Sequence, residues 1–141
     1  FGYEKFSKVQ ISKLIKLCLN LKRKYNIKDS NIVGHSDIAP LRKQDPGEKF
    51  PWKKLQKKKL GIWYKNFKFK SKGQINKKNV KSFYKNLFKI GYRYFDQNKR
   101  TSKDALIVKA FQRRFLPREI TGQINEKTYI ISQFLAIRSK N

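Results

Sequence analysis

The sequence predicts an α/β segment over residues 1–63, a linker over 64–73 and a small all-helical domain over 74–141. Three observations lead to this prediction. The apolar residues of the first segment follow one helical period and then a short β-branched run, residues 34–52 follow no period, and the apolar residues after 74 fall into three helical patterns. A length of 141 residues allows one ordinary domain or two small ones.

The first predicted element is a helix that begins after Ser7. Ser7 and Gln10 have the spacing of a capping box, in which each side chain bonds the backbone N–H of the other residue. Apolar residues then recur at spacings of three and four and form one stripe, made of Ile11, Leu14, Ile15, Cys18, Leu21 and Tyr25. Cys18 lies on this stripe, and we expect it to be a small buried hydrophobic residue.

A brief strand is predicted at Ile32-Val33, because two β-branched residues directly precede Gly34. One helix and one strand lack a second layer and a partner strand. Residues 1–63 are therefore expected to be the end of a larger domain whose beginning is absent. The chain contains no methionine, even at position 1, which agrees with that expectation.

The later elements are predicted to be helical. A short basic helix is expected at Trp52–Lys59, and longer amphipathic helices at Lys77–Lys89 and Ser102–Phe115 and after Asn125. Three such helices can cover one another's apolar faces, so residues 74–141 could fold alone.

Composition limits the classes of protein that fit. No apolar run is long enough for a membrane helix, and the single cysteine excludes an internal disulfide. The single histidine, His35, excludes a His-rich metal site built by this chain alone. The net charge of +27 suggests polyanion partners, and 25 basic residues but only four acidic ones lie after residue 52. A/T-rich codons encode half of the residues, so base composition is an equally good source of the lysines.

The segment 34–52 carries the residues with the most chemistry. His35 and Asp45 are ten residues apart, and imidazole and carboxylate are both zinc ligands. Lys43 lies two residues before Asp45, so an extended backbone points both side chains to one side. An ammonium there can stabilise negative charge on a carbonyl oxygen under attack. On spacing alone, a histidine near an aspartate is more often a hydrogen-bonded structural pair than a pair of zinc ligands.

The motifs of this segment resemble a known family. The runs His35-Ser-Asp-Ile-Ala-Pro40, Arg42-Lys43-Gln-Asp45-Pro46-Gly47 and Phe50-Pro51-Trp52 are similar to the last third of the type 2 N-acetylmuramoyl-L-alanine amidases, above all the AmiD group. The resemblance implies a mixed sheet with helices on both faces. It implies one Zn²⁺, with His35 and Asp45 as ligands and a third ligand, a histidine, upstream of this chain.

The resemblance also implies a role for Lys43, which matches the lysine that stabilises the reacting carbonyl. From its chemistry, Arg42 could either bind a carboxylate of the stem peptide or pack the fold. Asp37 could orient His35, although a bond within the loop is favoured. The implied reaction is zinc-dependent hydrolysis of the amide between N-acetylmuramic acid and L-alanine. The family's first zinc histidine and its glutamate base lie upstream, so this chain alone is expected to be inactive.

The run Ala110-Phe-Gln-Arg-Arg-Phe115, followed by Gly122-Gln-Ile-Asn125, resembles the three-helix peptidoglycan-binding module. The resemblance implies peptidoglycan or muropeptides as partners, no specific nucleic acid and no transmembrane segment. It implies a periplasmic monomer in the bacterial cell envelope, where a missing N-terminus could anchor it to the outer membrane. Two alternatives stay open, a basic helical nucleic-acid-binding module and a non-catalytic wall-binding protein.

Overall fold

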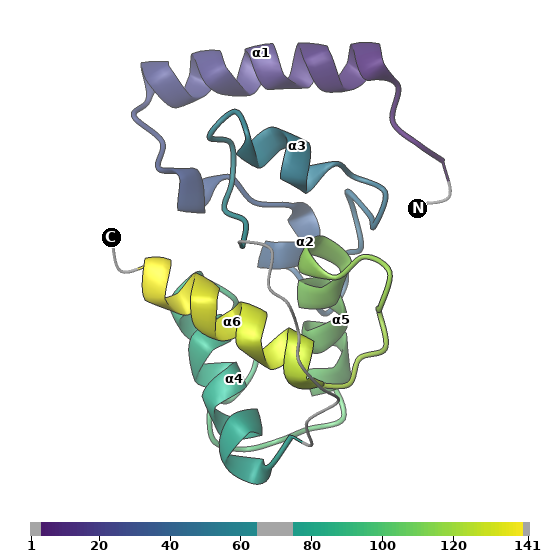
Figure 1. The fold of residues 1–141 in the computed structure, drawn as a ribbon, viewed down its shortest axis with the longest axis vertical. Coiled ribbons are helices and arrows are strands. Elements are labelled where there is room, and N and C mark those ends of the chain that lie inside the picture. Colours follow the sequence, from purple (N-terminus) through teal and green to yellow (C-terminus); the bar gives the residue numbers. More distant parts are fainter. Residues whose placement is uncertain (1–3, 65–74, 140–141) are drawn as a thin grey trace.

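The computed structural model describes residues 4–64 and 75–139, and within these ranges every regular element is helical (Figure 1). The elements follow in the order α1 (Lys8–Lys24), η1 (Asp29–Asn31, a 3₁₀ turn), α2 (His35–Ile38), α3 (Trp52–Gln56), α4 (Lys77–Ile90), α5 (Asp104–Phe115) and α6 (Glu126–Arg138). Apart from Tyr64, the predicted linker over 64–73 lies outside the described residues.

The predicted α/β fold with a mixed sheet is wrong, because the described residues contain no strand. At the predicted strand, Ile32 does have an extended backbone, with φ −94° and ψ 101°. A β-ladder needs a second strand alongside, and the described parts of the chain place none there. The Ile32 carbonyl instead accepts a hydrogen bond from Arg114 Nη2 at 3.3 Å. The aperiodic run that follows also contains one helical turn, α2.

Helix α1 begins at the predicted capping box. Gln10 N donates to Ser7 Oγ at 3.1 Å, and Ser7 N donates to Gln10 Oε1 at 2.8 Å. One face of α1 covers α3 in the upper layer of Figure 1. The buried residues of this layer are Ile11, Trp52, Leu55 and Leu60. Cys18 is half-buried beside them, and this burial raises the pKa of its thiol. The apolar stripe therefore has a partner along only part of its length.

Helices α4, α5 and α6 form the lower part of the molecule and enclose the larger core. The fully buried side chains of this core are Phe83, Leu87, Ile107, Val108, Ala110, Phe111, Phe115, Ile131 and Leu135. Asn125 caps α6 by accepting from Thr128 N at 2.9 Å. Gly91 ends α4 with φ +116°, a backbone conformation that costs glycine little. These local signals were readable in the sequence because each lies within a few residues of its partner.

A side chain of α5, Gln112, holds the turn that precedes α6. Gln112 is fully buried, and its Oε1 accepts from Gly122 N while its Nε2 donates to the Gln123 carbonyl, both at 2.8 Å. Gly122 has φ +77°, and a Cβ there would come within 3.0 Å of Lys109 Cε. The amide of Gln112 therefore holds a turn that only glycine fits without strain.

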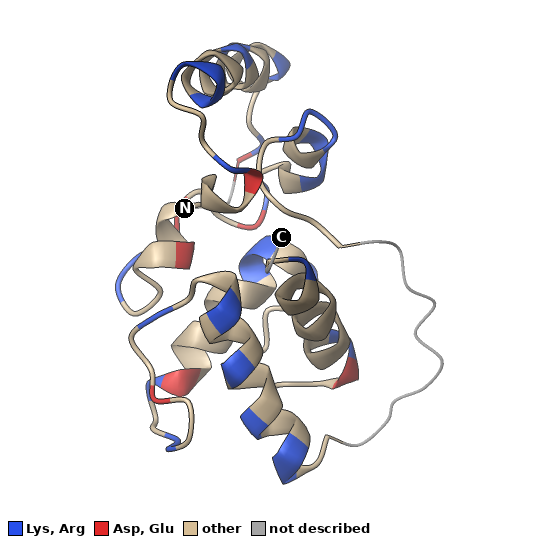
Figure 2. Ribbon diagram, turned by 90° about the vertical axis from the view of Figure 1, so that its left-hand side faces the viewer, with Lys and Arg blue, Asp and Glu red and all other residues tan. Residues whose placement is uncertain are grey.

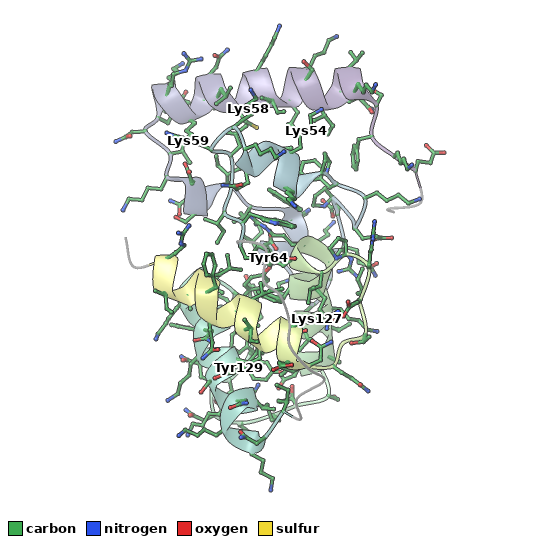
Figure 3. All side chains as sticks on the ribbon, in the orientation of Figure 1. Lys54, Lys58, Lys59, Tyr64, Lys127 and Tyr129 are labelled. Carbon is green, nitrogen blue, oxygen red and sulfur yellow. The ribbon has the colours of Figure 1, made fainter. Side chains whose placement is uncertain are left out.

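The two parts meet through residues that precede the undescribed segment. Trp63 packs against both hydrophobic clusters, with its ring centroid 5.6 Å from that of Phe115. Tyr64 donates its hydroxyl proton to the Phe115 carbonyl at 3.0 Å. Figure 3 places Tyr64 between the upper layer, where Lys54, Lys58 and Lys59 lie, and α6, which carries Lys127 and Tyr129. The division into two domains at 64–73 remains a prediction.

Basic side chains are spread widely over the described surface. Figure 2 shows Lys and Arg on α1, α3 and α4, with few acidic residues between them. None of the helices in residues 4–64 and 75–139 combines the length and apolarity that crossing a membrane requires.

Candidate metal site

The first predicted ligand, His35, opens the single helical turn α2. Gly34 precedes it in an extended conformation, and Gly34 N donates to Asp37 Oδ2 at 2.8 Å. A Cβ on Gly34 would lie 2.7 Å from Pro46 Cδ and 3.1 Å from Trp52 Cζ2. The backbone just before His35 is therefore tightly packed against the segment that carries the second predicted ligand.

That second ligand, Asp45, lies in a four-residue turn. Gly47 N donates to the Gln44 carbonyl at 3.0 Å, and the Asp45–Pro46 peptide is cis. A cis-proline at the third position defines a type VI turn. The Asp45 carbonyl accepts from Ser36 N at 2.8 Å, so the turn is bonded directly to α2.

These two turns bring His35 and Asp45 together. His35 Nδ1 lies 3.2 Å from Asp45 Oδ2, and the two side chains are 39% and 40% exposed. A neutral imidazole with its proton on Nδ1 would donate to the carboxylate at this distance. The pair is accessible from the solvent.

Lys43 and Arg42 lie between α2 and Asp45, where backbone hydrogen bonds fix their positions. Both N–H groups donate to the Ala39 carbonyl, at 3.0 Å for Lys43 and 3.1 Å for Arg42. Lys43 is half-buried and Arg42 is exposed. Within the described residues neither side chain has an ion pair or a hydrogen bond. Both cations thus remain available to a ligand.

Asp37 has partners of a different kind. Besides Gly34 N, its carboxylate accepts from the Tyr92 hydroxyl at 2.5 Å and forms an ion pair with Arg114 Nη1. As whole residues, Asp37, Tyr92 and Arg114 are each at most 4% exposed. No hydrogen bond in the described residues joins Asp37 to the His35 ring, so its contacts run from the turn to the lower helices.

Tyr92 and Arg114 were not singled out from the sequence. Arg114 lies on the buried face of α5, seven residues after Ile107, and an arginine at a core-facing position was the available signal. Tyr92 directly follows the C-cap glycine of α4. Burial, and secondly the negative charge of Asp37, hold the pKa of Tyr92 well above its ordinary value. The hydroxyl therefore stays protonated and donates to the carboxylate.

The donor pair fits a zinc ion. Two ligand atoms that each lie about 2.0–2.1 Å from a tetrahedral Zn²⁺ are about 3.3 Å from each other, and the His35–Asp45 separation is 3.2 Å. Imidazole nitrogen and carboxylate oxygen are both common zinc donors. The described residues contain no group of three His, Cys, Asp or Glu side chains placed to hold a metal. In the described part of the chain, His35 and Asp45 are therefore a pair of donors with no third one beside them.

The family model for N-acetylmuramoyl-L-alanine amidase matches residues 1–48, which include both donors. Among curated relatives, the N-acetylmuramoyl-L-alanine amidase AmiD of Escherichia coli is 33% identical over 135 residues, which cover 92% of this chain and 48% of AmiD. Over nearly its whole length, the chain is therefore similar to the amidase AmiD. The 1,6-anhydro-N-acetylmuramyl-L-alanine amidase AmpD of Enterobacter cloacae is 43% identical over 50 residues, covering 36% of this chain and 27% of AmpD.

Solved structures agree with this relationship. The complex of E. coli AmiD with anhydro-N-acetylmuramic acid-L-Ala-D-gamma-Glu-L-Lys superposes with a TM-score of 0.81 at 28% identity, covering 95% of this chain and 53% of that one. AmpDh3 of Pseudomonas aeruginosa in complex with anhydromuramic pentapeptide gives a TM-score of 0.83 at 28% identity, covering 98% and 56%. The chain thus spans about half the length of AmiD and AmpDh3.

Proposed function

We propose that the full-length protein hydrolyses the amide between N-acetylmuramic acid and L-alanine, in peptidoglycan or its fragments, with the help of one Zn²⁺. The observation that carries the proposal is the His35 Nδ1–Asp45 Oδ2 separation of 3.2 Å on an accessible surface. It is supported by the AmiD and AmpD relatives and by the muropeptides bound in two similar structures.

His35 and Asp45 would hold the metal, which when bound supplies a Lewis acid that polarises the scissile carbonyl and activates a water molecule. A histidine outside this chain would be the third ligand. Lys43 would place its ammonium near the carbonyl oxygen, where negative charge develops during attack. Arg42, exposed and without an acidic partner in the described residues, would bind a carboxylate of the stem peptide through paired N–H groups.

Residues 74–141 would act as a peptidoglycan-binding module beside the catalytic part. The enzyme would work as a monomer in the periplasm, where its substrate is found. Nucleic-acid binding would be limited to weak, salt-sensitive association, because dispersed lysines contribute counterion release without base recognition. The 141-residue chain alone, with two ligands, would not catalyse the reaction.

The test uses the full-length protein and an anhydro-N-acetylmuramoyl peptide, with products identified by mass spectrometry. We expect release of the free peptide that begins with L-alanine, loss of this activity on zinc chelation and its return with added Zn²⁺. The His35→Ala variant should be inactive, whereas Asp29→Ala, a surface aspartate paired with Lys22, should keep activity. Cleavage at another bond, or cleavage insensitive to chelation, would overturn the proposal.

A further inference from the structure

The contacts of Arg114 and Tyr92 join the lower helices directly to the turn of the candidate metal site. We propose that these two residues are positioning residues for the His35–Asp45 pair, which makes the helical part a component of the site's scaffold in addition to any wall-binding role. The proposal concerns metal binding and therefore rests on the proposed function, although its first test below does not require activity.

The first step concerns Arg114, which extends from α5 into the part of the molecule formed by residues 4–64, called the upper part here. Its Nη1 pairs with Asp37, its Nη2 donates to the Ile32 carbonyl at 3.3 Å, and its guanidinium carbon lies 4.0 Å from the ring centroid of Trp52. A Cβ on Gly61 would lie 3.1 Å from Nη2. One side chain of α5 thus contacts three separate points of the upper part and leaves little room beside a fourth, Gly61.

The second step runs from these points to the ligands. The Asp37 carboxylate accepts a hydrogen bond from Gly34 N, and Gly34 directly precedes His35. Trp52, beneath the guanidinium, also lies close to Gly34, as does Pro46, which follows Asp45. Arg114 therefore supports the backbone on both sides of the pair without touching either ligand. Groups that orient metal ligands in this indirect way commonly change metal affinity when they are replaced.

The third step is the part played by Tyr92. The Tyr92 hydroxyl donates to Asp37 Oδ1, while Gly34 N and Arg114 Nη1 donate to Oδ2. Both oxygens of the buried carboxylate are thereby engaged, and the carboxylate has one orientation. If these contacts only joined the two parts of the molecule, weakening them would leave the His35 ring unchanged. The state of the His35 ring therefore distinguishes a positioning role from a purely structural one.

The first test uses the single histidine as a reporter in the 141-residue chain. Long-range ¹H–¹⁵N spectra at fixed neutral pH show which ring nitrogen of His35 carries the proton. We expect the wild-type chain to favour the Nδ1–H tautomer that faces Asp45. In the mild variants Tyr92→Phe and Arg114→Lys this preference should fall and the ring signals should broaden or split. Lysine keeps the charge at position 114 but cannot form the forked contacts.

Arg113→Ala is the matched control, because Arg113 adjoins Arg114 on α5 and is only half-buried. It should leave the His35 spectrum unchanged. Circular dichroism and thermal unfolding identify variants that remain folded, and Tyr92→Phe keeps the test available if Arg114→Lys does not fold. Folded Tyr92→Phe and Arg114→Lys chains with the wild-type His35 spectrum would overturn the proposal.

The second test is zinc affinity in the full-length protein, measured by competition with a chromophoric chelator. Tyr92→Phe and Arg114→Lys should each weaken binding by about 10–100-fold, with Arg113→Ala unchanged. Wild-type affinity in both variants would contradict the positioning role. Failure of the wild-type protein to bind zinc or cleave the muropeptide would instead refute the proposed function, while the spectra of the 141-residue chain would still decide whether Arg114 and Tyr92 position His35.

Discussion

The His35–Asp45 pair and the Asp37–Arg114 pair lie on the two sides of one helical turn, in opposite environments. The first pair has side chains 39% and 40% exposed, whereas the arginine and aspartate of the second are 3% and 5% exposed. An exposed pair is screened by water and contributes little to stability. A buried pair is costly to break, because the remaining charge has no solvent. The turn therefore separates an accessible donor pair from the contacts that hold it in place.

A large effect on turnover should come from Lys43, on the accessible side. Replacing Lys43 with Ala in the full-length protein should lower turnover by about 10²–10³-fold, as expected for loss of one group that stabilises charge in the transition state. Zinc content and unfolding midpoint should not change, because the side chain has no ion pair or hydrogen bond in the described residues. Turnover is measured on a muramoyl peptide with the zinc-loaded protein, and a wild-type rate would remove Lys43 from the reaction.

The next effect should come from the buried side and appear in stability. Arg114→Ala should lower the free energy of unfolding by about 3–5 kcal/mol, because it leaves the Asp37 carboxylate buried without its cation. His35→Ala should cost at most about 1 kcal/mol, since the exposed pair gains little in the absence of metal. Urea unfolding of the 141-residue chain measures both. Equal costs for the two variants would break the contrast between the two sides of the turn.

The smallest effect should appear only in alkaline solution. The folded-state pKa of Tyr92 is raised, so its contribution is complete below about pH 10, where the unfolded tyrosine ionises, and is lost as pH rises toward the folded-state value. Above pH 10, wild-type stability should fall more steeply than that of Tyr92→Phe, by up to about 1.4 kcal/mol per pH unit. Urea unfolding at pH 8, 10 and 11 gives both slopes. Identical slopes would show that the hydroxyl is not held protonated.

The comparison also shows which features the sequence could predict. The caps at Ser7 and Asn125 and the glycine at 91 act within a few residues, so their signals are local and the structure contains them. His35 and Asp45 are ten residues apart in the sequence and are brought together by two neighbouring turns. The predicted strand at residues 32–33 failed because a strand depends on a distant partner, which a local β-branched pattern does not supply.

The Asp37–Arg114 contact joins residues 77 positions apart, and the Asp37–Tyr92 contact joins residues 55 apart. Neither has a local periodic signal. The chain contains 36 lysine and arginine residues, so the sequence alone does not indicate that Arg114 is buried. Only the packing of α5 against α2 reveals it. Long-range polar contacts between the two parts were therefore beyond what residue spacing could indicate.

Zinc bound by the full-length protein, measured by elemental analysis after dialysis, tests the central claim most directly. The account predicts about one equivalent in the wild-type protein and in the surface control Asp29→Ala, and a large loss in both His35→Ala and Asp45→Ala, because each removes one donor of the pair. Wild-type protein that retains no zinc, or His35 and Asp45 variants that retain a full equivalent, would contradict it.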